Sequence, residues 1–152
     1  RPMPARDDGA ILGILAAANA TEIESGTLAE QRGAAKEVRA IGTRLKEDHS
    51  RAQREGEALA KKINVTVKPA SKDSVAGDEA DDLAELQTKT GEDFDHAFLD
   101  VQEDLHEETI ESIRKTLLPA ATSPELRTFL QQLLPQLQSH LDMTRAAKKQ
   151  IS

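Results

Sequence analysis

Four residues whose side chains can bind a proton or a metal ion fall on the apolar faces of the helices expected from this sequence. They are Glu22, His49, His106 and His140, and each follows an aliphatic residue by four or seven positions. Because side chains at these spacings share one face of a helix, we expect all four to point into the core. One carboxylate and three imidazoles match the ligand set of a mononuclear zinc, iron or copper site.

The same four residues lie at similar heights if the helices fold back at short turns. Counted from a turn near Gly33, the glutamate and the first histidine lie 11 and 16 positions away. Counted from a turn near Ala121, the other two histidines lie 15 and 19 positions away. At about 1.5 Å of rise per residue, each pair is offset by less than two turns. The four side chains could therefore meet in the middle of a bundle, although the stagger also allows two separate pairs.

A hydrogen-bonded network without a metal ion is the alternative interpretation of these residues. An imidazole on an apolar face is often a hydrogen-bonded core residue. A buried glutamate without a partner costs several kcal/mol, so Glu22 must have partners inside the core or reach solvent. His96, the fourth histidine of the chain, is expected at the surface. The residues alone leave both interpretations open.

Three further polar residues are expected to support the site from outside. Gln102 and Thr144 each lie one helical turn from a core histidine, where they could orient it. Glu103 precedes His106 by three positions, the Glu-x-x-His spacing found in di-iron bundles. A second copy of this spacing is missing at the other two core histidines, which argues against a full di-iron centre. An oxidase or peroxidase is therefore a third interpretation, and the sequence assigns no catalytic residue and leaves enzymatic activity uncertain.

The elements that would position these side chains follow from apolar residues spaced three, four and seven apart, which predict four long amphipathic helices and one short one. The predicted ranges are residues 10–32, 34–63, 78–89, 92–118 and 124–149. Pro119 is expected to end the fourth of them. Residues 64–77 are rich in polar residues, Pro and Gly and predict a crossover loop, and residues 1–7 an N-terminal extension. We expect one all-α domain over residues 1–152, a ferritin-like antiparallel four-helix bundle whose long connection carries the short helix.

Composition excludes several other classes of protein. The 152 residues include no Cys, and only 2% are aromatic, so disulfides and thiolate sites are excluded and a β-sandwich or barrel is disfavoured. The net charge of −7 argues against a nucleic-acid partner. No apolar stretch is long enough for a transmembrane segment. A phosphate-binding loop is also missing, so we expect no organic cofactor beyond the single metal ion.

Several short segments, taken in order, resemble one bacterial family of exported or putative outer-membrane proteins of unknown function. They are Glu22 to Ala29, Asp48-His49, Phe94-Asp95 with His106 twelve positions after Phe94, Leu134-Pro135 and His140-Leu141. The resemblance implies a ferritin-like bundle and a periplasmic or secreted protein whose signal sequence is absent from this chain. The family's characteristic acid and histidines fall on the four residues already selected.

Two functions are therefore expected for the chain. The first is metal binding in the bundle core through one Glu and three His, with zinc, iron or copper as the ion. The alternative is a metal-free structural or stress-related interaction module of the cell envelope. An envelope protein or a second copy of the chain is the partner expected in either case.

Overall fold

The structure is a computed structural model that describes residues 7–71 and 75–151, and its regular elements are helices. In chain order they are α1 (Asp8–Arg32), α2 (Lys36–Lys62), α3 (Val75–Leu86), α4 (Gly91–Ser112), the π-helical η1 (Ile113–Leu117), α5 (Leu118–Ala120) and α6 (Pro124–Ile151). The prediction of an all-α fold with four long helices and a short helix in one connection is confirmed.

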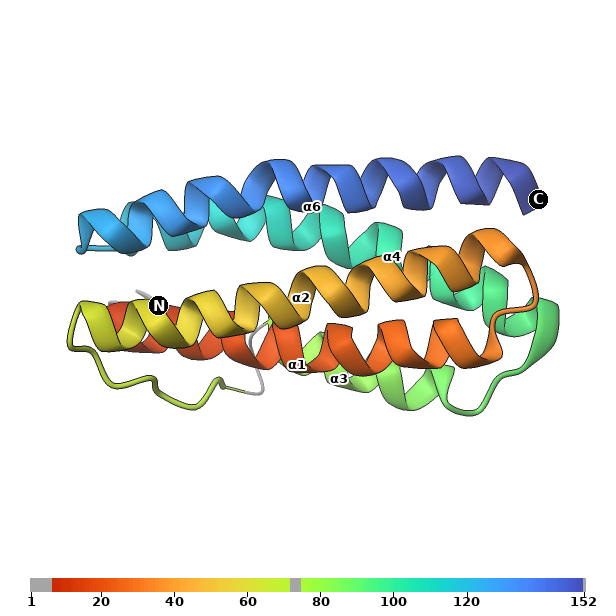
Figure 1. Ribbon diagram of the computed structural model, residues 1–152, viewed down its shortest axis with the longest axis horizontal. Helices are drawn as coiled ribbons and strands as arrows, with labels where there is room; N and C mark the ends of the chain where they lie inside the picture. The colour runs from red at the N-terminus through yellow and green to blue at the C-terminus, as the bar shows by residue number, and fades with distance from the viewer. Residues whose placement is uncertain (1–6, 72–74, 152) are drawn as a thin grey trace, which may run out of the picture.

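The long helices form two antiparallel hairpins that pack against each other (Figure 1). One hairpin is α1 with α2, and the other is α4 with α6, whose start follows η1 and α5. Helices α1 and α6 run in one direction, and α2 and α4 run in the other. The connection from α2 to α4 crosses the length of the bundle and carries α3, which packs on α1 and α4. A single long crossover between two hairpins is the connectivity of ferritin-like bundles.

Some predicted boundaries differ from those of the structure. Helix α3 begins at Val75, three residues before the predicted start, so the crossover loop is shorter than residues 64–77. Residues 72–74 of that loop and residues 1–6 of the predicted N-terminal extension lie outside the described residues. Asp7 caps α1, because its Oδ1 accepts a hydrogen bond of 2.8 Å from the amide of Ala10.

The prediction that Pro119 ends its helix at residue 118 is wrong by two residues. Helical backbone continues through η1 and α5 as far as Ala120. Proline has no amide hydrogen, and its ring clashes with the carbonyl four residues earlier in a regular α-helix. The wider π-helical turn comes directly before the proline, and the amide of Leu118 reaches the carbonyl of Ile113. The local widening lets the helix include the proline and end one residue later.

Each hairpin turn contacts one buried aspartate of the opposite hairpin. Asp95 of α4 accepts hydrogen bonds of 2.9 and 2.8 Å from the amides of Ala34 and Ala35, in the turn between α1 and α2. Asp8 of α1 accepts bonds of 2.8 and 3.0 Å from the amides of Thr122 and Ser123, in the turn before α6. These contacts fix the relative height of the two hairpins, and with it the height at which their core side chains meet.

A pair of glycines brings α1 and α2 close together beside the polar residues of the core. A Cβ atom on Gly26 would lie 2.6 Å from the carbonyl oxygen of Gly42, and one on Gly42 would lie 2.5 Å from that of Gly26. Larger residues would push the two helices apart at this point. Gly26 lies one turn after Glu22, so this close approach lets Glu22 and His49 reach the same point in the core.

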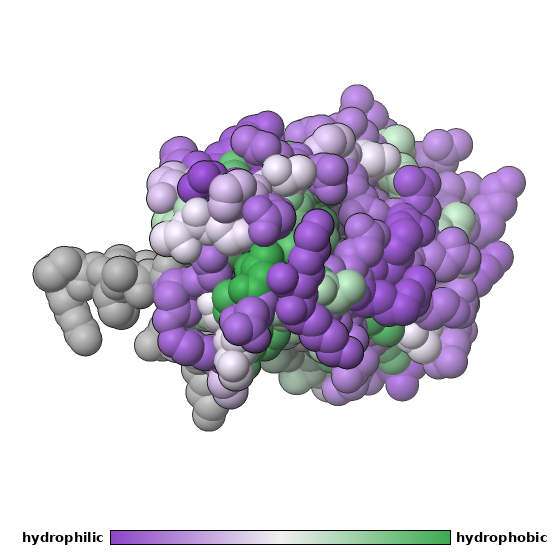
Figure 2. Space-filling model, turned by 60° about the vertical axis from the view of Figure 1, so that its left-hand side comes forward, coloured by the Kyte–Doolittle hydropathy of each residue, from purple (hydrophilic) through white to green (hydrophobic). Residues whose placement is uncertain are grey.

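The apolar core is divided into two clusters of buried side chains, one toward each end of the bundle. The first includes Ile11, Leu126 and Leu130, and the second includes Val38 and Phe94. Between them lies a layer of buried polar side chains, which is described below. Most of the surface visible in Figure 2 is hydrophilic, with apolar side chains seen in a narrow hollow. Within residues 7–71 and 75–151, no helix has the length and apolar character needed to cross a membrane.

Candidate metal centre

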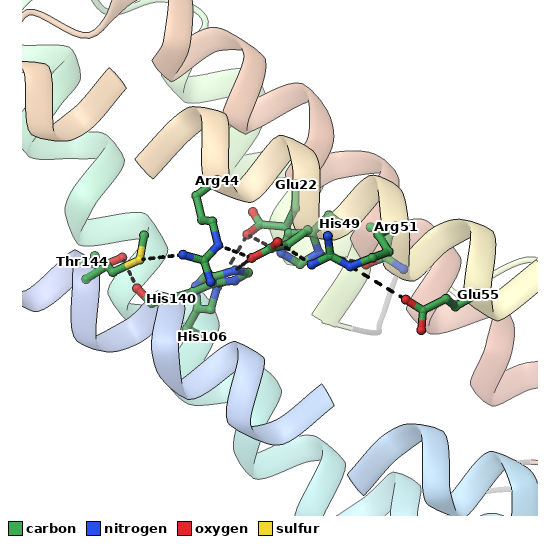
Figure 3. A network of polar contacts seen from close by, with 11 residues as sticks. Glu22, Arg44, His49, Arg51, Glu55, His106, His140 and Thr144 are labelled. Carbon is green, nitrogen blue, oxygen red and sulfur yellow. Dashed lines mark hydrogen bonds and ion pairs between the residues drawn. The ribbon is translucent and has the colours of Figure 1, made fainter. Parts of the chain in front are cut away.

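Three imidazoles from three different helices meet in the middle of the bundle (Figure 3). His49 comes from α2, His106 from α4 and His140 from α6, and these residues are 8%, 2% and 0% exposed. One ring nitrogen of each lies within 4.8 Å of the corresponding nitrogens of the other two. Glu22 of α1, which is 3% exposed, lies beside them. The structure thus brings together one polar side chain from each long helix, as the heights counted along the sequence allowed.

The hydrogen bonds of His106 and His140 determine which of their ring nitrogens carry protons. Nδ1 of His106 lies 2.8 Å from the backbone carbonyl oxygen of Gln102, which can only accept, so Nδ1 is protonated. Nε2 of His140 lies 2.7 Å from Oδ2 of Asp48, so it donates to this carboxylate. In the neutral rings the other nitrogens, Nε2 of His106 and Nδ1 of His140, therefore carry lone pairs. They face each other at 3.4 Å, where two acceptors cannot form a hydrogen bond.

His49 is oriented in the same way by a neutral partner. Its Nδ1 lies 2.8 Å from the side-chain carbonyl oxygen of Asn19, to which it donates. Its Nε2 is buried and has no hydrogen-bond partner among the described residues. An orphaned buried nitrogen is expensive unless something else supplies the missing contact. All three histidines thus donate one N–H to a fixed acceptor and turn their second nitrogen toward a shared point.

Glu22 faces that point with one carboxylate oxygen. Its Oε2 lies 3.7 Å from Nε2 of His49 and 3.9 Å from Nε2 of His106. Its Oε1 accepts a hydrogen bond of 3.1 Å from the side-chain amide of Gln102, which also contacts Ser25 Oγ at 3.2 Å. Gln102 therefore supports the cluster twice, because its backbone carbonyl holds His106 and its side chain holds Glu22.

The pKa values of these groups are shifted toward their uncharged forms. Burial lowers the pKa of His106 to about 4 and the pKa of His49 well below its usual value, with help from the neighbouring histidines. Burial also lowers the pKa of His140, although the hydrogen bond to Asp48 opposes this shift. Burial raises the pKa of Glu22 to about 7, against a smaller opposite effect of Gln102. The imidazoles are therefore neutral at pH 7, which is the form that binds metal ions.

Asp48 is a functional candidate that the sequence analysis missed. Burial alone would raise its pKa, but hydrogen bonds from His140, Arg44 and Arg51 outweigh burial and lower the pKa to about 2. The two arginines contact its oxygens at 2.7 and 2.6 Å. A carboxylate that accepts the N–H of a ligating histidine orients the ring and makes it a stronger ligand. Arg44 and Arg51 lie four and three positions from Asp48 on the same helix, but nothing in the sequence indicated a contact between residues 48 and 140.

The other predicted residues take different places. Thr144 is buried and donates a hydrogen bond of 2.8 Å to the backbone carbonyl of His140. Glu103 is not part of the cluster, because its carboxylate turns toward α6, where Lys148 and Arg145 contact it at 2.7 and 3.2 Å. His96 is exposed. The Glu-x-x-His spacing thus places its two side chains toward different neighbours.

A cavity of about 40 Å³ adjoins the cluster on the side of Glu22, His49 and His106. Glu79 of α3 lines it as well, is 3% exposed, and was also missed by the sequence analysis. Its Oε2 finds no hydrogen-bond partner within residues 7–71 and 75–151. Burial, followed by the charge of Glu22, raises the pKa of Glu79 well above its usual value. The only sequence signal for this residue was its place in the short helix of the crossover.

The spacing of the donor atoms suits one small metal ion. Atoms bound at about 2.0–2.1 Å to a tetrahedral zinc ion lie about 3.3–3.4 Å from one another. Three of the separations, at 3.4, 3.7 and 3.9 Å, are close to this value, and the ligand nitrogens of the three histidines all lie within 4.8 Å of one another. The two contacts of Glu22 with histidine nitrogens are too long for hydrogen bonds. Three neutral imidazoles and a carboxylate could thus hold a zinc, iron or copper ion.

Comparison with known proteins identifies a family without an assigned activity. No curated protein and no solved structure matches the chain. The family model of a domain of unknown function, DUF4142, matches residues 1–147. The match spans α1 to α5, most of α6 and all of the residues of the polar cluster. The chain therefore belongs to the DUF4142 family.

Proposed function

We propose that this protein binds one transition-metal ion in the bundle core through His49, His106, His140 and Glu22. The observation that carries the proposal is the set of contacts that the three imidazoles make. Each ring has one nitrogen within hydrogen-bond distance of a fixed acceptor, and the second nitrogens face Glu22 in His49 and His106 and face His106 in His140. Such an arrangement is repulsive without a cation and favourable around one.

Zinc is the ion we propose first, with iron and copper as alternatives, because all three accept imidazole and carboxylate ligands. The resemblance to exported bacterial proteins supports a role in the cell envelope, where the site would store or sense the ion. Fractionation of cells that express the protein from its natural gene tests the compartment. Recovery of the protein in the cytoplasm would contradict it.

Metal analysis tests the proposal directly. The chain is purified without an affinity tag, stripped with a chelator, reloaded with Zn²⁺ and desalted. We expect one zinc per chain and a higher melting temperature, since an ion that binds only the native state stabilises it. His106→Ala should weaken binding by more than the roughly 100-fold typical of groups that merely support a ligand.

His96→Ala is the matched control, because it removes an exposed histidine from the same helix. It should leave both stoichiometry and affinity unchanged. A stoichiometry well below one in the wild type, with no gain in melting temperature, would contradict the proposal. The metal-free structural module would then be the better interpretation, and His106→Leu should be tolerated.

A further inference from the structure

The carboxyl group of Glu79 has no role in the proposed metal site, yet it lines the cavity that adjoins it. It is 3% exposed, and its Oε2 has no hydrogen-bond partner among the residues that the structure describes. Thr109 lines the same cavity and slightly opposes the rise in the pKa of Glu79. A buried carboxyl oxygen without a partner usually faces something that completes its contacts.

The size and walls of the cavity limit what that partner can be. The volume of about 40 Å³ is room for about three waters, at roughly 10–15 Å³ each. Most of the remaining wall is aliphatic, with Leu15, Leu105, Ile113 and Leu137 among its residues. A ligand of two to four non-hydrogen atoms fits this space, whereas a larger organic molecule does not.

Charge limits the partner further. A divalent ion bound by three neutral imidazoles and the Glu22 carboxylate keeps a net charge of about +1 in a buried setting. A buried, uncompensated charge is unfavourable, so a small anion at the open side of the ion would be stabilised. Burial favours the protonated form of Glu79, whose O–H can donate to such an anion.

From these observations we infer that the cavity is the binding site of a small inorganic monoanion. The anion would coordinate the metal ion on the side of Glu22, His49 and His106 and accept a hydrogen bond from Glu79. This inference rests on the proposed metal site. It adds to that site an exchangeable ligand position and a residue, Glu79, that selects the ligand.

Azide binding to the Co²⁺-loaded chain tests the inference. Visible absorption of Co²⁺ reports a change in coordination, and a titration gives the azide dissociation constant for each variant. We expect azide to bind the wild type and Glu79→Leu to weaken it at least tenfold. Glu79→Gln, which keeps an N–H donor, should weaken it less. Ala18→Leu, which fills the cavity from a residue that does not bind the metal, should also weaken it.

Glu85→Leu is the matched control, because it changes an exposed glutamate on the same helix α3. It should bind azide as the wild type does, and benzoate should be excluded from all variants by its size. Two results would overturn the inference while the metal site stands, provided that Co²⁺ binds at one per chain. Either azide leaves the spectrum unchanged, or Glu79→Leu and Glu85→Leu weaken azide binding equally. If Co²⁺ does not bind, the proposed function itself fails.

Discussion

Two buried carboxylates flank the histidine cluster, and their surroundings are opposite. Asp48 and Glu22 are equally buried, at 3% exposed. Asp48 accepts hydrogen bonds from His140 and from two arginines, and its pKa falls to about 2. Glu22 accepts a hydrogen bond from the neutral amide of Gln102, and its pKa rises to about 7. The comparison teaches that donors with a positive charge can keep a buried carboxylate stable as an anion, whereas one neutral amide does not.

The same contrast locates the place where a cation is needed. On the Asp48 side, Arg44 and Arg51 already supply positive charge. On the Glu22 side, the carboxylate faces the lone pairs of neutral imidazoles. A metal ion bound there would stabilise the ionised form of Glu22, as the arginines stabilise the ionised form of Asp48. Variants on each side of the cluster test this difference.

The largest effect concerns the pH dependence of the metal-free protein. A carboxyl group whose pKa rises from 4.5 to about 7 on folding binds more protons in the native state, so its contribution to stability is lost as pH rises through this range. The loss amounts to about 3 kcal/mol in the free energy of unfolding. The Glu22→Gln variant should not show this loss of stability.

The buried histidines titrate in the same range with the opposite sign, because their lowered pKa values make the native state gain stability as pH rises. The quantity to measure by urea unfolding is therefore the wild-type free energy minus that of Glu22→Gln. This difference should fall between pH 4.5 and 8. A flat difference would mean that Glu22 is not a buried titrating group.

The next effect concerns metal affinity and the two groups that orient histidines. Groups that orient ligands typically contribute 10- to 100-fold to affinity. We expect Asp48→Ala to weaken Zn²⁺ binding about 100-fold, because a carboxylate makes His140 a stronger ligand, and Asn19→Ala to weaken it about 10-fold. Competition with a chelator of known affinity measures both. Equal losses would show that the charge of the acceptor does not matter.

Acid unfolding tests the Asp48 side by itself. Its pKa is lowered from 3.8 to about 2 on folding, so its contribution to stability is present above pH 4 and lost as pH falls toward 2. The contribution is about 2 kcal/mol. The wild-type free energy of unfolding minus that of Asp48→Asn should fall by this amount on acidification. The Glu22→Gln variant, studied in parallel, should retain the wild-type acid response.

The smallest effect is expected at Glu103, the glutamate of the Glu-x-x-His spacing. Its contacts with Lys148 and Arg145 lie at the partly exposed surface between α4 and α6, where ion pairs contribute less than about 1 kcal/mol. Glu103→Gln should therefore leave Zn²⁺ affinity unchanged in the chelator competition. A tenfold loss of Zn²⁺ affinity would show that Glu103 supports the metal site.

Much of the architecture could be predicted from the sequence because its signals are local. Apolar periodicity marked α2, α4 and α6, whereas α1 begins with a run of apolar residues that are buried in succession. Spacing from apolar residues also selected Glu22 and the three histidines as residues that point inward. The proline at residue 119 shows the limit of such rules. Whether a proline ends a helix depends on whether the preceding turn can widen, and the π-helical turn before it does so.

The composition and spacing of this sequence by themselves determined an all-α bundle with one acid and three imidazoles facing its core. Only the tertiary structure decided that the four side chains lie at one height, because Asp8 and Asp95 fix the two hairpins against each other through contacts that no local pattern reveals. It alone also paired Asp48 with His140 and brought Glu79 to the cavity. Residues 48 and 140 lie 92 positions apart. Periodicity tells which way a side chain points, but its partner depends on how distant segments pack.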